Sequence, residues 1–122
     1  MMGPHKNLDV WNKSMRLTEE IYRITRSFPR EELFGLVSQM RRAAASIPSN
    51  IAEGYGRSSN AEVLHFLYIS LGSSNELDTQ MLISRQQAFV NDEDYMIVDK
   101  LNEDVNKMLN SLIYKRSHLQ QQ

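Results

Sequence analysis

The sequence has few side chains whose types and spacing could support catalysis or metal binding. Glu62 and His65 are three residues apart, which is the Glu-x-x-His spacing of di-iron helical bundles. Such a centre needs two pairs of this kind and two further carboxylates, but the other histidines, His5 and His118, lie near the ends of the sequence. We therefore interpret His65 as an exposed histidine on a helix. We predict no metal site, no cofactor and no catalytic residue.

Two further patterns lack the context that their chemistry requires. Gly54-Tyr-Gly56 is a lone Gly-x-Gly with no strand before it, so a glycine at a helix C-terminus explains it better than a dinucleotide loop. Serines are plentiful, but no Ser/His/acid set is suggested by position. The sequence has no cysteine, which excludes disulfides and thiolate metal sites. We predict that the protein is not an enzyme.

A stripe of polar residues with the helical period lies between residues 39 and 53. It consists of Gln39, Arg42, Ser46, Asn50 and Glu53 and lies beside an apolar stripe of the same period. Arg42, Asn50 and Glu53 could form a recognition site. Alternatively, the stripe is a network that fixes helix register, since buried polar groups need partners and one buried asparagine can specify an oligomeric state. We favour the network.

Basic side chains gather at the start of the chain. Residues 1–30 carry six Lys and Arg against three Asp and Glu, whereas residues 91–122 carry four against six. The candidate phosphate-binding side chains are Lys13, Arg16, Arg23, Arg26 and Arg30. A ring of copies would repeat them as a basic band that attracts nucleic acid. The alternative, which we favour, is a solvated face that pairs with the acidic fourth helix.

Length and composition fit one helical domain. The chain has 122 residues, enough to bury a substantial core, and we predict a single domain spanning residues 1–122. Its 14 Lys and Arg and 15 Asp and Glu give a net charge of −1, which argues against a generic polyanion binder. No signal peptide and no window as long as a membrane span is recognisable. We expect a cytoplasmic protein that makes no membrane contact.

The apolar spacing predicts an all-α fold, an antiparallel up-down-up-down four-helix bundle. We place the helices at about residues 8–27, 36–55, 60–88 and 92–116. Asn7 or Asp9 can cap the first helix, Ser59 with Glu62 forms a capping box for the third, and residues 91–94 cap the fourth. Pro48 lies inside the second helix, where the unchanged period predicts a kink rather than a break.

The third predicted helix is apolar on every side in its first half. Its apolar residues there are Val63, Leu64, Phe66, Leu67, Tyr68, Ile69 and Leu71. A helix in a four-helix bundle keeps one outer face, so something outside the bundle must cover this one, and a second copy of the chain is the cheapest candidate. The small residues 72–74 follow, and we expect them to pack closely against residues 43–46 of the second helix.

The segment from Gln39 to Gly54 resembles the hallmark of a bacterial family of four-helix bundles. This family is named for reading frames in the intervening sequences of 23S rRNA genes and is often labelled S23 ribosomal protein. The resemblance covers roughly residues 8–114. The matching strings are Phe28-Pro-x-x-Glu-x-Phe-Gly-Leu36, Gln39-x-x-Arg42-Ala-Ala-x-Ser46-Ile-Pro48-x-Asn50-Ile-Ala-Glu53-Gly54 and Gly72-Ser-x-x-Glu76-Leu77.

The resemblance implies a four-helix bundle that assembles as a homopentamer. It also extends to the accessory variability proteins of diversity-generating retroelements, which bind nucleic acid and a reverse transcriptase. The motif residues that it places at structural interfaces are Gln39, Arg42, Ser46, Pro48, Asn50, Glu53, Gly54, Gly72 and Glu76.

Together these patterns predict a non-catalytic oligomeric assembly or adaptor protein. It would associate through its second and third helices and present a surface to a protein partner or to structured RNA. The alternative is direct RNA or DNA binding as the primary role, through the five cations of the first thirty residues. Salt dependence would separate the two, because phosphate-led binding weakens steeply as salt rises and apolar contacts do not.

Overall fold

The computed structural model describes residues 3–120, which form four long helices and no strand, so the predicted all-α class is confirmed. The helices are α1 (Asp9–Thr25), α2 (Ser38–Tyr55), α3 (Asn60–Gln86) and α4 (Asp92–Gln120). A short 3-10 turn, η1 (Pro4–Asn7), comes before α1. A second 3-10 turn, η2 (Arg30–Glu32), and a π-helical turn, η3 (Leu33–Val37), connect α1 to α2.

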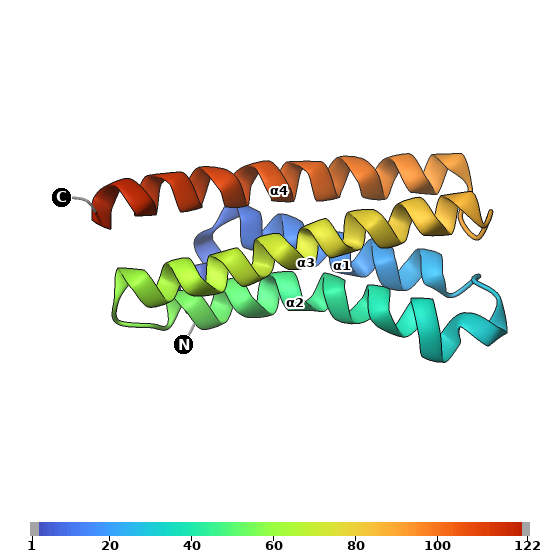
Figure 1. Cartoon of the computed structure of the whole chain (residues 1–122), viewed down its shortest axis with the longest axis horizontal. Helices are drawn as coiled ribbons and strands as arrows, with labels where there is room; N and C mark the ends of the chain where they lie inside the picture. The colour runs from blue at the N-terminus through green and yellow to red at the C-terminus, as the bar shows by residue number, and fades with distance from the viewer. Residues whose placement is uncertain (1–2, 121–122) are drawn as a thin grey trace.

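The four helices pack side by side as a square. Each packs mainly against the helices beside it: α1 against α2 and α4, and α3 against α2 and α4. The colours in Figure 1 show α1 and α3 running in one direction and α2 and α4 in the other. This arrangement is compatible with the predicted up-down-up-down order. It also puts the side formed by α1 and α2 opposite the side formed by α3 and α4.

One apolar core fills the space between the helices. Every helix contributes side chains with no exposed surface, and burying each one stabilises the fold by about 1.5–3 kcal/mol before entropy is counted. These side chains include Leu17, Ile21, Met40, Ile47, Ile51, Leu67, Leu77, Val98, Val105 and Leu109. Their spacing of four, seven or ten along each helix follows the period that predicted the bundle.

α2 continues through Pro48, as the unbroken period predicted. Proline has no N–H, so the carbonyl of Ala44 one turn earlier has lost its usual donor. The hydroxyl of Thr18, on α1, lies 3.1 Å from this carbonyl oxygen and 2.8 Å from the carbonyl oxygen of Ser14. A neighbouring helix therefore supplies the hydrogen bond that the proline removes, at a position where Ala44 is fully buried.

Small residues of α2 and α3 let the two helices approach closely. A Cβ added to Gly54 would lie 2.8 Å from the Cβ of Phe66, a distance that no side chain can tolerate. The hydroxyl of Ser73 donates to that of Ser46 at 2.9 Å, so residues 73 and 46 meet as expected. Gly72 does not take part in this contact, because it is exposed and a Cβ there would meet nothing within 4 Å.

The helix ends agree with two of the three predicted caps. Ser59 accepts from the N–H of Glu62 at 3.2 Å, and Asn91 accepts from the N–H of Asp94 at 2.7 Å. The prediction for α1 is wrong: Leu8 is its cap residue, without a side-chain bond. Asn7 cannot serve there because it closes the preceding 3-10 turn, and Asp9 is already the first helical residue.

Three helix ends differ from the predicted ones. α1 ends at Thr25, two residues early, because the N–H groups of Ser27 and Phe28 bond three residues back in a tighter turn. α3 ends at Gln86, where the left-handed backbone of Ala88, with φ of 59°, turns the chain away. α4 continues to Gln120, four residues beyond the predicted end.

We predict that Thr18→Val lowers the free energy of unfolding by about 1–3 kcal/mol, because it leaves the buried Ala44 carbonyl without a donor. The matched control is Thr79→Val, whose hydroxyl bonds the exposed carbonyl of Asn75 and whose loss should change stability by less than about 0.5 kcal/mol. Urea denaturation followed by circular dichroism measures both. Equal effects of the two substitutions would contradict this role for Thr18.

Candidate interaction surfaces

The predicted polar stripe of α2 is divided in the structure. Asn50 donates to the carbonyl and hydroxyl oxygens of Ser46 at 2.8 and 2.9 Å, and Ser73 of α3 joins them. Gln39, Arg42 and Glu53 are exposed. Glu53 pairs with Arg57 one turn later rather than with the other members of the stripe. The half-buried part of the stripe thus belongs to the α2–α3 contact, and its charged members lie on the surface.

Two of the five predicted phosphate-binding cations pair with α4. Lys13 lies 3.2 Å from Asp104, and Arg23 lies 2.8 Å from Asp94. The pairing of α1 with the acidic fourth helix therefore holds at these positions. Among residues 3–120, no ion pair is found for Arg16, Arg26 or Arg30, whose side chains are exposed.

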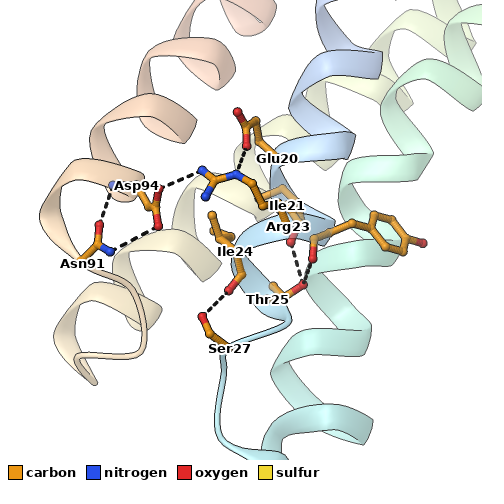
Figure 2. Close-up of polar contacts among 9 residues, drawn as sticks. Glu20, Ile21, Arg23, Ile24, Thr25, Ser27, Asn91 and Asp94 are labelled. Atoms are coloured by element: carbon orange, nitrogen blue, oxygen red, sulfur yellow. Dashed lines mark hydrogen bonds and ion pairs between the residues drawn. The ribbon is translucent and has the colours of Figure 1, made fainter.

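Figure 2 shows how Arg23 connects the two helices. Its guanidinium donates to Asp94 and to Glu20, and these two carboxylates raise the pKa of Arg23 above its ordinary value. Asp94 also accepts from the side-chain amide of Asn91, at 3.3 Å. Since Asn91 caps α4, one chain of polar contacts joins the start of α4 to the last turns of α1.

A pocket lined by three arginines lies where the connection between α1 and α2 joins these two helices. We call it the arginine pocket; it encloses about 360 Å³, and no carboxylate lines it. Its lining residues are Thr25, Arg26, Phe28, Pro29, Arg30, Leu33, Val37 and Arg41. Arg41, which the sequence analysis did not single out, donates to the hydroxyl of Thr25 at 3.0 Å and lies 4.8 Å above the ring of Tyr22. These contacts orient its guanidinium.

Beside the arginine pocket, the turn η3 presents an unusually exposed aromatic ring. Phe34 is 94 % exposed, and Leu33 is 44 % exposed. Gly35, which follows, leaves helical geometry with φ of −115° and ψ of −107°. A phenyl ring exposed to water contributes little to the stability of the folded chain.

A second hollow, on the opposite side of the bundle, carries an excess of carboxylates. This acidic groove lies between α3 and α4, encloses about 310 Å³ and is lined by Asn75, Asp78, Asp99, Asn102, Glu103, Asn106 and Lys107. Its floor is a polar network in which Ser74 donates to Asn102 at 2.7 Å and Asn106 donates to Asn75 at 2.9 Å. Neither the groove nor its network was predicted.

Carboxylates in the acidic groove are incompletely neutralised. Lys107 pairs with Glu103 at 2.8 Å and lowers the pKa of that carboxyl. The pKa of Asp99 is raised, first by partial burial and then by the nearby charges of Asp78 and Glu103. No ion pair holds Asp78 or Asp99 in the described part of the chain, so this groove favours a cationic neighbour.

The outer face of α3 exposes apolar side chains around Gly72. Val63, Leu64 and Leu67 are buried in the core, but Tyr68 and Ile69 remain half exposed. Leu82 and Ile83, three turns further along, are likewise exposed by 44 % and 41 %. Among the described residues of this apolar segment, therefore, only the outward-facing Tyr68 and Ile69 remain exposed to solvent.

The structure gathers no metal-binding set within residues 3–120. Glu62 and His65 are both exposed, and the His65 ring packs edge-on against Phe66. Within the same residues, no helix is both long and apolar enough to cross a bilayer.

The protein is an all-α helical bundle. Its main surface features are the arginine pocket, the acidic groove and the exposed apolar side chains of α3. The family model of the 23S rRNA-intervening sequence protein matches residues 6–111, and the chain therefore belongs to the 23S rRNA-intervening sequence protein family, as its resemblance predicted. No curated protein matches the sequence significantly.

A solved structure supports the same conclusion. The chain is similar to a protein of unknown function from the S23 ribosomal protein family of Bacteroides thetaiotaomicron VPI-5482. The two sequences are 25 % identical, the match covers 86 % of this chain and 95 % of the other, and the TM-score is 0.80.

We predict that two neighbouring carboxylates of α4 affect stability in opposite directions. The pKa of Asp104 is lowered by Lys100 and then Lys13, so its stabilisation is present at neutral pH and is lost as pH falls through that lowered value. The raised pKa of Asp99 means that the folded state gains stability as pH falls through it, and that the charged form is unfavourable at neutral pH.

Asp99→Asn should therefore raise the free energy of unfolding at neutral pH, and Asp104→Asn should lower it. Urea denaturation of both variants and the parent protein, from neutral to acidic pH, measures the difference. The two variants should converge toward the parent protein at low pH. Shifts of the same sign at neutral pH would contradict these electrostatics.

Proposed function

We propose that this protein is a non-catalytic assembly module that associates with copies of itself and presents the resulting surface to a partner protein or to structured RNA. Membership of the 23S rRNA-intervening sequence protein family supports the proposal, and the family resemblance suggests a ring of five copies. The observation that carries it is the outer face of α3 around Gly72.

Glycine in the middle of a helix is unfavourable by about 1 kcal/mol relative to alanine. Gly54 has a reason within the chain, because Phe66 leaves no room for a side chain there. Gly72 has none, since a Cβ at that position would meet nothing within 4 Å. The half-exposed Tyr68 and Ile69 lie one turn before it. A glycine with exposed apolar side chains one turn before it suits close approach by another backbone, so we assign this face to contact with a second copy.

Gly72→Ala tests this assignment. If the face is in contact, the added methyl should weaken self-association, which light scattering over a dilution series measures, although it should favour the helix of the separate chain by about 0.5–1 kcal/mol. The matched control is Ser111→Ala on the exposed surface of α4, which should leave the oligomer mass unchanged. A Gly72→Ala protein that associates as strongly as the parent would refute the assignment.

A second candidate function is direct RNA or DNA binding, which the unpaired cations Arg16, Arg26 and Arg30 favour. Lys13 and Arg23 count against it, because Asp104 and Asp94 neutralise them. We rank it below assembly. If assembly is the primary role, any binding of a labelled RNA hairpin measured by fluorescence anisotropy at near-physiological salt should be unchanged in Arg26→Gln/Arg30→Gln. Micromolar binding that falls as salt rises, and that is lost in Arg26→Gln/Arg30→Gln, would reverse this ranking.

A further inference from the structure

The two halves of the sequence carry opposite charge and occupy opposite sides of the bundle. Residues 1–58 contain nine Lys and Arg against six Asp and Glu, whereas residues 59–122 contain five against nine. The first half provides α1 and α2, and the second half provides α3 and α4. Because each of these pairs forms one side of the square, the nearly neutral chain has a basic side and an acidic side (Figure 1).

Part of the excess charge of each side lies in a hollow. The arginine pocket on the basic side combines Arg26, Arg30 and Arg41 with an apolar floor and has no carboxylate in its lining. The acidic groove on the other side holds Asp78 and Asp99 without an ion pair among the described residues. These two hollows cannot meet within one chain, because the bundle core separates them.

Exposed apolar side chains accompany the charges on both sides, near the same end of the bundle. Phe34 and Leu33 lie beside the arginine pocket, in the connection from α1 to α2. Leu82 and Met96, exposed by 44 % and 69 %, lie one turn or less from Asp78 and Asp99 along α3 and α4, toward the connection between those helices. Figure 1 shows that both connections lie at one end.

We propose that copies of this chain associate front to back, so that the arginine pocket of one copy receives the acidic groove of the next. This rests on the self-association proposed above and specifies the two surfaces that meet. Charge complementarity selects the second copy as the occupant, since the arginine pocket carries cations alone and the acidic groove carries more carboxylates than cations. A contact of either side with itself would oppose like charges. Unlike surfaces that bind in this way leave one of each free, so the contact propagates until a ring closes.

Two charge-reversal variants test the contact. Arg26→Glu/Arg30→Glu disables the arginine pocket and leaves Arg41 and its bond to Thr25 in place. Asp78→Lys/Asp99→Lys disables the acidic groove. Lys6→Glu/Lys115→Glu is the matched control, because these two exposed lysines lie in η1 and in the last turns of α4. Circular dichroism verifies folding, and light scattering gives the mass of each protein relative to the 14.2 kDa chain.

Each reversed variant alone should be a monomer, and the control should keep the parent mass. An equimolar mixture of the two reversed variants should associate again, because the unchanged groove of one variant meets the unchanged pocket of the other and their two reversed surfaces are complementary as well. All four substitutions on one chain exchange the two signs and should restore the parent assembly.

A parent protein that assembles while either reversed variant keeps the parent mass would overturn the front-to-back contact and leave self-association standing. The same conclusion follows if both variants are monomers but their mixture does not associate. A monomeric parent protein would overturn both the contact and the assembly function.

Discussion

The bundle depends on the close packing of α2 against both of its neighbours. Gly54 allows α3 to approach without a side chain between the backbones, and Pro48 leaves a carbonyl that α1 satisfies through Thr18. Both features would be costly in an isolated helix and are favourable only when the neighbouring helices are in place. The most distinctive stretch of the sequence thus fixes the positions of α1 and α3, and through them the two sides that face outward.

Polar contacts and charge then give those sides different characters. Ion pairs between α1 and α4 remove Lys13 and Arg23 from the basic surface, while the Ser74 and Asn102 network holds the floor of the acidic groove. What remains exposed is a set of arginines on one side and a set of carboxylates on the other. The fold and the surface charge are therefore linked, because the ion pairs that join α1 to α4 also determine which charged side chains stay unpaired on the surface.

Sequence periodicity was sufficient for the helices and for most of the core, since burial follows spacing along a single helix. Residue types supplied the contact between residues 72–74 and residues 43–46, which the structure shows at Ser73 and Ser46, and the caps at Ser59 and at residues 91–94. Periodicity could not locate the arginine pocket or the acidic groove, because each joins residues from two helices. Arg41 escaped notice because its role depends on Thr25 and Tyr22 of α1. The cap of α1 was wrong because the preceding 3-10 turn has no clear apolar pattern.

The ion pairs between α1 and α4 have a consequence for synthesis of the chain on the ribosome. Lys13 and Asp104 are 91 residues apart, and Arg23 and Asp94 are 71 apart, whereas α2 and α3 meet across a short loop. Contacts of such long sequence separation form late, since the intervening chain must first be ordered. α1 is synthesised before α2, α3 and α4 but is fully covered only when α4 is in place, so its α4-facing side stays open while these three helices are being made.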